Sequence, residues 1–424
     1  MTNVIIEETA ELKGFIRVPP SKSYTHRCII AASLSKGKSR IFSPLFSDDT
    51  LATIKACSSL GISIEQMEDR LEILGSSELI APKDEVDCGE SASTIRFLAP
   101  IAALAKGETV LTGSPGLRRR PVGPLVSALE QLGVRCKSNR GFPPIIVFGG
   151  GIRGGNTSLV GDVSSQFVTG LLFACPLAEN NTQILLTTSL ESKPYVELTL
   201  DIIKKHGIHV DVSGDFRKFE VPGRQEYRPH DHTIPGDFSS AAFLLAAAAI
   251  TGSHIRVENL SLNQPDSEIV EILGRMRINV KVRDGSIEVF RGELKGVIID
   301  AKDTPDLVPV CAVLACFSKG TTKIYGAKRL RIKETDRLAA LLSELRKMGA
   351  KIVENLDGLT IEGLCDLKGT TVNSHNDHRI AMACAIAALK ARGKTEILRA
   401  ECVSKSYPNF FNDLTKLGGN IHVS

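Results

Sequence analysis

The sequence predicts an α/β protein of two domains, each built from three copies of a repeating unit of about 70 residues. Three observations support this. The length of 424 residues exceeds what one hydrophobic core usually organises. A turn recurs at a nearly constant spacing, and a short Ala-rich apolar segment recurs once per repeat. Each unit reads as a helix, a strand, an amphipathic helix and a strand pair.

The recurring turn ends an amphipathic segment and leads into a β-like run. It lies at Leu60-Gly61-Ile62, Leu132-Gly133-Val134, His206-Gly207-Ile208, Met276-Arg277-Ile278, Met348-Gly349-Ala350 and Leu417-Gly418-Gly419, with steps of 72, 74, 70, 72 and 69 residues. Glycine at five of the six positions fits the residue after a helix, where the backbone turns left-handed at little steric cost. Arg277 is the exception.

The apolar segments predict six buried helices, at 27–34, 94–105, 167–178, 240–250, 307–317 and 380–389. A helix without a polar stripe must be covered on all sides, and small side chains let several such helices approach closely at a domain centre. A β-like strand follows the helix in most units, for example at 37–41 and 107–111. Hairpin strands such as 71–74 and 287–290 complete the unit.

Prolines cluster at Pro19-Pro20-Ser21 and at 229–235, where the repeat phase passes its midpoint. We place the linkers there, which gives one domain of residues 1–20 plus 235–424 and an inserted domain of residues 21–234. An open solenoid of six units is the alternative architecture.

The composition excludes several classes of function. A net charge of +4 over 424 residues is too small for a broad nucleic-acid-binding surface. No run approaches the roughly 20 apolar residues of a membrane span. The ten cysteines form no C-x-x-C pair, so neither a zinc site nor a redox motif is indicated. Scattered cysteines and an acidic N-terminus favour a cytoplasmic protein, with a monomer as the default.

Polar residues gather where each buried helix is expected to begin. In chain order these clusters are Lys22-Ser23, Gly89-Glu90-Ser91, Ser164-Ser165-Gln166, Gly236-Asp237, Thr304-Pro305-Asp306 and Asn376-Asp377-His378-Arg379. The free N–H groups and the dipole of a helix start attract phosphate or carboxylate. Ser, Thr and Asp also cap helices, and for any single cluster capping is the stronger interpretation. Six clusters together favour a shared anion site.

Basic side chains lie beside the same helix starts: Lys22, Arg27, Arg120, Lys333, Arg337, Arg379 and Lys405. Arginine grips carboxylate and phosphate with two hydrogen bonds, while lysine supplies a compact charge and a transferable proton. In the run Arg118-Arg119-Arg120, two of the three arginines could simply face water. The pattern predicts an enzyme that binds two small anionic substrates.

The chain resembles the 5-enolpyruvylshikimate-3-phosphate synthase family along essentially its whole length. The matching stretches, in chain order, are 20–27, 47–50, 89–96, 120–123, 164–167, 192–195, 305–306, 331–338, 376–379 and 404–408. The resemblance implies a two-domain inside-out α/β barrel of six βαβαββ-type units, three per domain with pseudo-threefold symmetry. It also implies transfer of the enolpyruvyl group of phosphoenolpyruvate to the 5-hydroxyl of shikimate 3-phosphate, without a metal or organic cofactor.

The resemblance also implies the ligands of both substrates. Shikimate 3-phosphate would meet Lys22, Ser23, Arg27, Ser164, Ser165, Gln166, Ser192, Tyr195, Asp306 and Lys333. Phosphoenolpyruvate would meet Lys22, Ala92, Arg120, Gln166, Arg337, Arg379 and Lys405. Several cations are needed because the site must bring two phosphorylated molecules together. We expect binding to draw the two halves of the chain together.

The reaction removes a proton from the attacking hydroxyl and adds one to the methylene carbon before phosphate leaves. Asp306 is the candidate base toward the hydroxyl, and Glu334 and Lys22 are candidates for the remaining proton transfers. A structural role is open for each acid: Asp306 could cap a helix, and Glu334 could pair with Arg337 three residues on. His378 is equally compatible with a structural and a catalytic role.

Two departures from the family pattern affect the expected site. The family's loop reads Gly-Asn-Ala/Ser-Gly-Thr, whereas this chain has Gly89-Glu90-Ser91-Ala92-Ser93, so that Ala92 stands in place of glycine. Its methyl group is expected to weaken binding of the herbicide glyphosate. Arg329 lies where some members carry an asparagine that contacts shikimate phosphate, and that role is not transferred to it.

Two other functions compete. The related enolpyruvyl transferase that acts on UDP-N-acetylglucosamine shares the repeat but uses a cysteine acid on a mobile loop. The corresponding loop here, residues 112–120, contains no cysteine. A non-catalytic anion-binding repeat protein would lack acid–base groups, whereas Asp306 and Glu334 are both present.

Overall fold

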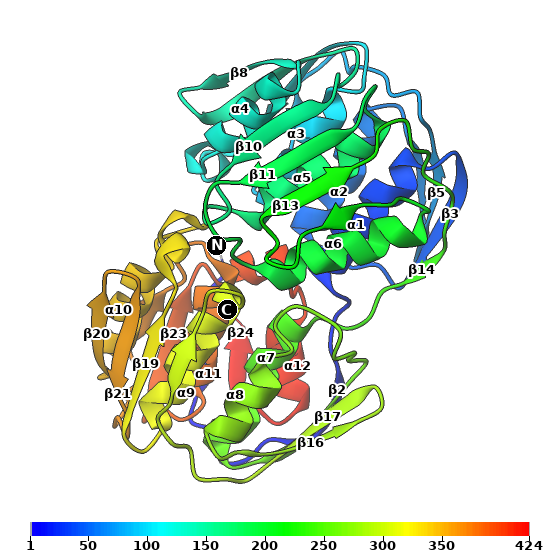
Figure 1. Cartoon of the computed structure of the whole chain (residues 1–424). Coiled ribbons are helices and arrows are strands. Elements are labelled where there is room, and N and C mark those ends of the chain that lie inside the picture. The colour runs from blue at the N-terminus through cyan, green and yellow to red at the C-terminus, as the bar shows by residue number, and fades with distance from the viewer. Residues whose placement is uncertain (1, 424) are drawn as a thin grey trace. The chain divides into compact units, whose positions relative to one another are not determined.

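The computed structural model describes residues 2–423 and divides the chain into two compact units. Unit 1 comprises Met1–Pro19 and Pro235–Ser424, and unit 2 comprises Pro20–Ile234. Within each unit the sheets form the outer wall and apolar helices form the centre (Figure 1). This is the inside-out α/β fold that the resemblance implies.

Unit 2 contains three four-stranded sheets. Their strand orders are β14 (His232–Thr233), β3 (Gly37–Phe42), β5 (Arg70–Gly75), β4 (Ser63–Gln66); β6 (Val86–Asp87), β7 (Gly107–Thr112), β9 (Phe142–Gly149), β8 (Arg135–Asn139); and β10 (Gly155–Leu159), β11 (Thr182–Leu186), β13 (Lys218–Val221), β12 (Asp211–Val212). In each sheet the first two strands pair parallel and the others pair antiparallel.

Unit 1 repeats the pattern, with two strands supplied by the start of the chain. Its sheets are β2 (Lys13–Arg17), β15 (His254–Glu258), β17 (Ser286–Phe290), β16 (Asn279–Arg283); β18 (Ile298–Asp300), β19 (Thr321–Tyr325), β21 (Gly358–Glu362), β20 (Lys351–Asn355); and β22 (Thr371–Asn373), β23 (Lys394–Leu398), β1 (Val4–Glu7), β24 (Ile421–Val423). β1 lies between β23 and β24 and pairs antiparallel with both.

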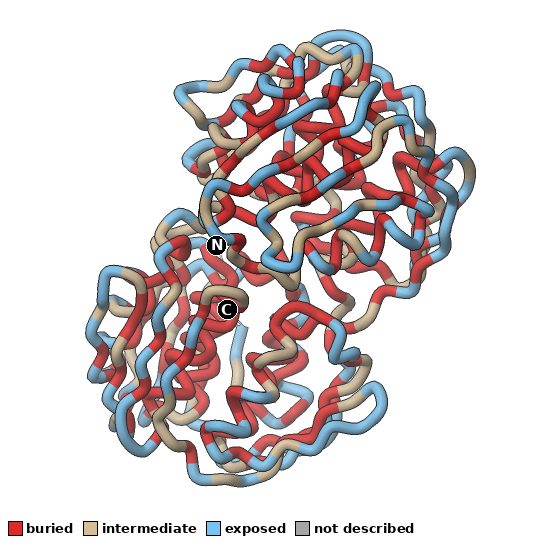
Figure 2. The backbone as a smooth tube through the Cα atoms, viewed as in Figure 1, coloured by how far each residue is buried: buried red, intermediate tan, exposed pale blue. Residues whose placement is uncertain are grey.

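The six apolar segments form buried helices, as the sequence predicts. They are α1 (Lys22–Leu34), α3 (Ala92–Ala102), α5 (Ser165–Ala174), α7 (Phe238–Thr251), α9 (Val308–Phe317) and α11 (His378–Ala388). In Figure 2 the buried residues concentrate on these central helices. All six helices differ from the predicted ranges by one to five residues at one or both ends. At two ends the chain forms a 3-10 turn instead: Cys175–Leu177, which contains Pro176, and Pro305–Leu307. Proline lacks the N–H that a continuing α-helix needs.

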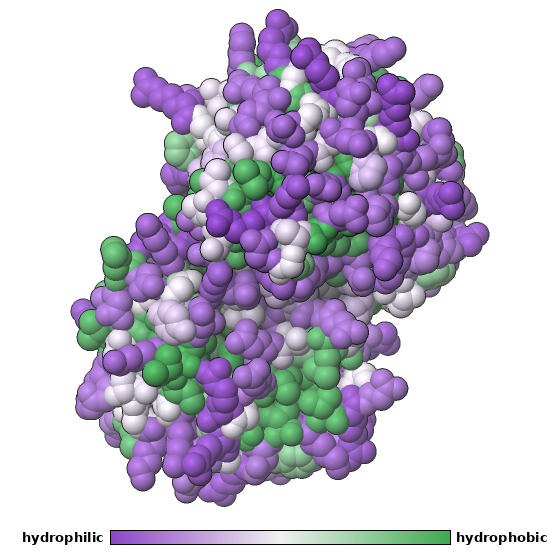
Figure 3. All heavy atoms as spheres, in the orientation of Figure 1, coloured by the Kyte–Doolittle hydropathy of each residue, from purple (hydrophilic) through white to green (hydrophobic). Residues whose placement is uncertain are grey.

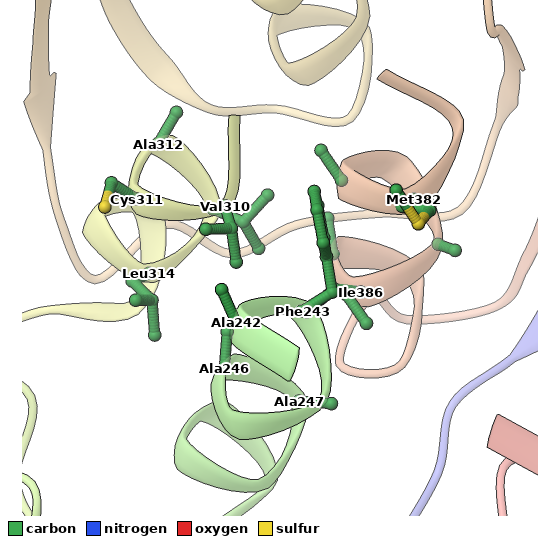
Figure 4. Close-up of a cluster of buried hydrophobic side chains, with 14 of the residues drawn as sticks. Ala242, Phe243, Ala246, Ala247, Val310, Cys311, Ala312, Leu314, Met382 and Ile386 are labelled. Atoms are coloured by element: carbon green, nitrogen blue, oxygen red, sulfur yellow. The ribbon is translucent and has the colours of Figure 1, made fainter. Parts of the chain in front are cut away.

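The centre of unit 1 shows why small residues recur in these helices. α7, α9 and α11 contact one another. In Figure 4, Phe243 of α7 points between α9 and α11, while Ala242 lies toward Val310 of α9. All three of these residues are 0% exposed. Alanine on one helix leaves room for the larger side chain of the next, which gives dense packing.

The amphipathic helices cover the outside of this core and end at the recurring turn. They are α2 (Asp48–Ser59), α4 (Gly123–Gln131), α6 (Lys193–Lys205), α8 (Ile269–Arg275), α10 (Arg337–Lys347) and α12 (Phe410–Lys416). All five turn glycines have positive φ, from +84° at Gly207 to +104° at Gly418. Arg277 adopts the same left-handed backbone, with φ at 65°.

Hydrophilic side chains occupy most of the face shown in Figure 3. Within residues 2–423, no helix combines the length and the apolar character needed to span a bilayer. All ten cysteines are free thiols, and nine of them are buried.

Candidate active site

Capping side chains begin five of the six buried helices. Ser21, Ser91, Ser164, Asp237 and Asp377 each accept a hydrogen bond from a backbone N–H two or three residues later. The capping interpretation therefore holds for these residues. The side chains that we expected to bind anions mostly follow the cap by one to three positions, so that one turn of chain carries both roles.

Lys22 is the first residue of α1 and pairs with Asp49 of α2. Its Nζ lies 2.9 Å from Oδ2 of Asp49, and the two side chains are 16% and 8% exposed. Ser23 follows Lys22, and its carbonyl oxygen accepts a hydrogen bond from Arg27. The pairing with Asp49 fixes the lysine ammonium at the helix start.

Arg27 is a buried cation whose contacts within residues 2–423 are with neutral groups. It is 2% exposed; its Nε donates to Oγ1 of Thr199 at 2.8 Å and its Nη1 to the Ser23 carbonyl at 2.9 Å. The guanidinium also lies 5.1 Å from the Phe97 ring centre and 5.9 Å from that of Tyr195. Burial lowers the pKa of Arg27 to about 10, so it stays charged at neutral pH. A buried charge of this kind is stabilised by a bound anion.

Arg96 organises the start of α5. Its Nη1 donates to Oγ of Ser164 at 3.2 Å and to Oε1 of Gln166 at 2.9 Å, and Nε2 of Gln166 donates to Oγ of Ser93 at 2.8 Å. Ser165 is buried beside them. The orientation of Gln166 is therefore set by a charged donor on one side and a hydroxyl acceptor on the other.

Ser192 precedes α6 in a left-handed backbone conformation, with φ at 57°. A non-glycine residue in this region costs about 1–2 kcal/mol, and such residues cluster at functional sites. Ser192 is 5% exposed. Tyr195 lies three residues later, within cation–π distance of Arg27.

Arg120 is buried, whereas its neighbours Arg118 and Arg119 are exposed. It closes the 3-10 turn Leu117–Arg119 by donating its backbone N–H to the Leu117 carbonyl at 2.9 Å. The exposed pair agrees with the interpretation that two arginines of this run face water.

The two departures of the 89–93 loop occupy defined places. The Ser114 hydroxyl donates to the Glu90 carboxylate, which ties this loop to the segment that leads to Arg120. Ala92 is the first residue of α3 and is 4% exposed. Its methyl group is thus held by the helix backbone and cannot rotate away from whatever approaches the helix start.

In unit 1, Asp306 collects three cations around one carboxylate. Arg337 Nη1 lies 2.8 Å and Lys333 Nζ 3.9 Å from its Oδ1, and Arg379 Nη2 lies 3.1 Å from its Oδ2. Asp306 sits in the 3-10 turn before α9, and its side chain makes no helix-capping hydrogen bond. Capping therefore does not explain this aspartate.

Arg337 is the centre of this cluster. Besides Asp306 it pairs with Glu334 at 2.8 Å and with Asp377 at 2.7 Å, and its side chain is only 2% exposed. The predicted ion pair between Glu334 and Arg337 is present. Asp377 also caps α11 by accepting from the backbone N–H of Arg379 at 2.9 Å. Removing Arg337 would leave three carboxylates close together.

The charges of this cluster shift the pKa values of its members. Burial alone would raise the pKa of Asp306, but Arg379, Lys333 and Arg337 outweigh burial and hold it well below its usual range. Burial lowers the pKa of Lys333 to about 8, because Arg337 and Arg329 add to that effect while Asp306 opposes it only in part. Lys333 therefore titrates close to neutrality, whereas Asp306 stays ionised.

Asp266, which sequence reasoning missed, lies near the same cluster. Burial, followed by repulsion from Asp306, raises its pKa to about 7, although Arg379 and a hydrogen bond from Ser239 act the other way. No local motif marks Asp266. Its role depends on a fold that brings it beside Asp306, 40 residues later in the chain.

Three further residues of unit 1 are buried at the expected positions. Lys405 is 5% exposed and ends the 3-10 turn Ala400–Lys405. His378, at 1% exposure, lies against Asp377, with 3.8 Å between Nδ1 and Oδ1. Arg329 donates to the backbone carbonyl of Lys302.

Direct contacts join two groups of the predicted residues: Ser23, Arg27 and Tyr195 in unit 2, and Asp306, Lys333, Glu334, Arg337 and Arg379 in unit 1. Lys22, Ser23, Arg27, Ser164, Ser165, Gln166, Ser192, Tyr195 and Arg120 belong to unit 2, and Asp306, Lys333, Glu334, Arg337, Arg379 and Lys405 belong to unit 1. Sequence reasoning missed the structural roles of Asp49 and Arg96, and the ion pair of Asp377 with Arg337. All three lie inside the matched motifs, which was the available signal. Within residues 2–423, no group of three His, Cys, Asp or Glu side chains is arranged to hold a metal ion.

Comparisons with known proteins point to one family. The sequence model of EPSP synthase (3-phosphoshikimate 1-carboxyvinyltransferase) matches residues 6–414. The chain is 44% identical over 428 residues to a 3-phosphoshikimate 1-carboxyvinyltransferase of Methanocaldococcus jannaschii, covering 99% of both chains. It is 47% identical over 420 residues to one of Methanocella arvoryzae, covering 98% of both. A solved EPSP synthase from Acinetobacter baumannii superposes with a TM-score of 0.83 at 28% identity, covering 100% of both chains.

Proposed function

The chain belongs to the EPSP synthase (3-phosphoshikimate 1-carboxyvinyltransferase) family, and from this premise we propose how its side chains carry out the reaction. The enzyme transfers the enolpyruvyl group of phosphoenolpyruvate to the 5-hydroxyl of shikimate 3-phosphate and releases phosphate. This is a step of the shikimate pathway to aromatic amino acids.

Shikimate 3-phosphate takes its phosphate ligands from Ser23, Arg27, Ser164, Ser165, Ser192 and Lys333, with Tyr195 beside the ring and Gln166 between the substrates. The observation that carries this assignment is Arg27. In the described chain, the partners of this buried guanidinium are a hydroxyl, a carbonyl and two aromatic rings. The guanidinium has therefore lost its hydration without gaining a counter-ion. A phosphate dianion supplies the missing charge and matches the guanidinium geometry.

Phosphoenolpyruvate takes its ligands from Lys22, Arg120, Arg337, Arg379 and Lys405, with Ala92 and Gln166 lining its position. Arg337 already forms ion pairs with three carboxylates. It therefore acts on phosphoenolpyruvate mainly through its fixed positive charge and less as a hydrogen-bond donor. Arg379 and Lys405 are buried as well. Cations placed before the reaction need no reorganisation as charge moves toward the departing phosphate.

Asp306 is the proposed base toward the 5-hydroxyl. In the substrate-free protein, three cations hold its pKa low and make it a weak base. Substrate phosphates that bind Lys333 and Arg379 neutralise those cations, which raises the basicity of Asp306 when the hydroxyl is in place. Glu334 and Lys22 are the proposed groups for proton transfer to and from carbon and phosphate. Both are fixed by ion pairs, with Arg337 and Asp49 respectively.

The decisive experiment measures phosphate release from shikimate 3-phosphate and phosphoenolpyruvate. We expect Asp306→Asn to lower kcat by roughly 100- to 10,000-fold, as for loss of a general base. Arg120→Ala should raise KM for phosphoenolpyruvate roughly 10- to 100-fold, as for loss of a charged hydrogen bond. Arg119→Ala, an exposed neighbour, is the matched control and should behave as wild type.

Replacing shikimate 3-phosphate with UDP-N-acetylglucosamine should abolish phosphate release. Turnover of the nucleotide sugar, or wild-type kinetics for both Asp306→Asn and Arg120→Ala, would overturn the assignment. We further propose a cytoplasmic monomer, since ten free thiols suit a reducing compartment. Compaction on substrate binding stays a prediction, which X-ray scattering with an inert phosphoenolpyruvate analogue would test.

A further inference from the structure

Two cysteines that are distant in sequence meet at the end of α9 opposite Asp306. Cys316 lies in the last turn of α9, and Cys365 follows β21 by three residues. The backbone N–H of Cys365 donates to the Cys316 carbonyl at 2.8 Å. The Cys316 thiol donates to the Ala312 carbonyl at 3.3 Å and the Cys365 thiol to the Glu362 carbonyl at 3.1 Å, and each side chain shifts the pKa of the other. The hydrogen bond between Cys365 and Cys316 keeps the two backbones adjacent, and a disulfide spans Cα atoms roughly 4.4–6.8 Å apart.

Cys365 is the most accessible of the ten cysteines. It is half-buried, whereas the other nine are buried. Leu364, immediately before it, has a left-handed backbone with φ at 54° and is 69% exposed. A bulky non-glycine residue in this conformation is strained. An oxidant can therefore reach Cys365 directly and Cys316 only through it.

The hydrogen bonds of the Cys365 sulfur are to the backbone. It accepts from the N–H of Lys351 at 3.4 Å and donates to the carbonyl of Glu362 at 3.1 Å. The Cys316 side chain, the Lys351 N–H and the Lys351 charge lower the pKa of Cys365 to about 6, against burial and the nearby Glu362 carboxylate. The Cys365 side chain and burial raise the pKa of Cys316. Cys365 is therefore the more readily deprotonated of the two thiols.

We propose that Cys316 and Cys365 form a reversible dithiol–disulfide site that reacts with peroxides. The Cys365 thiolate attacks one peroxide oxygen, the O–O bond breaks, and the departing oxygen takes a proton; for hydrogen peroxide the products are a Cys365 sulfenic acid and water. The Cys316 sulfur then attacks the sulfenic sulfur, and the S–O bond breaks as a second water leaves with the Cys316 proton. The dithiol loses two electrons and two protons, and one peroxide becomes two waters.

The disulfide would tie the end of α9 to the β20–β21 hairpin. The start of α9 follows the 3-10 turn that carries Asp306, so the link fixes the far end of the helix that supports this residue. Because the Cys365 N–H already bonds the Cys316 carbonyl at 2.8 Å, we expect little backbone movement to be needed. We therefore expect catalytic activity to be retained and the apparent Tm to rise by roughly 5 °C, since the link shortens the unfolded chain.

The experiment treats the whole protein with limiting hydrogen peroxide, then alkylates it and maps its peptides by mass spectrometry. We expect a linked Cys316–Cys365 peptide as the first product, reversed by dithiothreitol. Iodoacetamide alkylation of Cys365 in the untreated protein should rise with pH through a midpoint of about 6. Cys316→Ala should abolish the link, leave a sulfenic acid at Cys365 and move that midpoint toward about 8.5.

Cys311→Ala is the matched control, because Cys311 lies on the same helix and points away from α7 in Figure 4. It should leave both the link and the alkylation profile unchanged. The proposal is overturned if peroxide oxidises other cysteines before Cys365, if Cys365 links to a residue other than Cys316, or if Cys316→Ala leaves the alkylation midpoint at its wild-type value.

Discussion

At the scale of single residues, Lys333 makes the proposed site sensitive to alkaline pH. Its pKa of about 8 means that it is charged below that pH and neutral above it. If the charged form holds the phosphate of shikimate 3-phosphate, kcat/KM for this substrate should fall about tenfold per pH unit above 8. Lys333→Arg should move this limb to higher pH, because arginine stays protonated. The pH dependence of initial rates would measure both.

Lys328→Arg is the control for that shift, since Lys328 is exposed at the start of the 3-10 turn that ends just before Lys333. Its profile should match wild type. An alkaline limb that stays in place in Lys333→Arg would show that another group causes it.

Ala92 offers a second test at this scale. Its buried methyl group stands at the start of α3, where glycine is usual in the family. We expect Ala92→Gly to tighten glyphosate inhibition roughly 10- to 100-fold, the range that one methylene controls in a fitted pocket. Turnover without inhibitor should change much less. Equal inhibition constants for the two proteins would refute this steric explanation.

Single residues also show where sequence reasoning ended. Asp306, Glu334 and Arg337 could be selected because they lie in motifs at a helix start. Asp266 could not, because its raised pKa arises from burial and from Asp306, neither of which leaves a local pattern. The low basicity of Asp306 in the free protein was equally invisible, since it requires Arg379 and Lys333 to converge on one carboxylate.

At the scale of elements, the recurring turn gives a stability prediction. Arg277 has the left-handed backbone that glycine adopts in the other five repeats. Arg277→Gly should relieve about 1–2 kcal/mol of backbone strain and cost about 0.5–1 kcal/mol in unfolded-chain entropy, so we expect a net gain of roughly 0.5–1 kcal/mol. Denaturant unfolding would measure it.

Gly349→Ala is the matched comparison, at the same position of another repeat. Its φ is +102°, and an added Cβ would lie 3.3 Å from the Asp366 carbonyl oxygen. It should destabilise the protein by 1 kcal/mol or more. The interpretation fails if Arg277→Gly is destabilising as well. This turn could be predicted because the 3.6-residue period of apolar residues in the amphipathic helix stops there, usually at a glycine. The end of that period is a local signal, and it is present also in the repeat that has Arg277 in place of glycine.

At the scale of the whole molecule, sequence reasoning identified the repeats but not the strand partners. β2 pairs with β15, so that Lys13 faces His254, and β14 pairs with β3, so that His232 faces Ile41. Partners about 200 residues apart share no local pattern, and only closure of the sheet selects them. The two-residue strands β6, β12 and β14 also carry too few side chains to show alternation.

This topology makes the first 19 residues part of unit 1. Val4, Ile6, Leu12, Ile16 and Val18 are all buried in its core. At roughly 1.5–3 kcal/mol for each buried side chain, their loss costs on the order of 10 kcal/mol, which is comparable with the total stability of a domain. Residues 235–424 alone also lack β1, the strand on which β24 pairs. Residues 20–234, by contrast, contain every strand of their three sheets.

We therefore expect residues 20–234 to unfold cooperatively as a separate polypeptide, and residues 235–424 to remain loosely packed until a peptide of residues 1–19 is added. Near-ultraviolet circular dichroism and thermal unfolding with and without the peptide would measure this. A peptide carrying Val4→Glu and Ile6→Glu is the control and should not restore packing, because both side chains are buried at 1% and 0% exposure. The prediction fails if residues 235–424 unfold cooperatively at a midpoint that the wild-type peptide leaves unchanged. That result would show that this unit folds without β1 and β2.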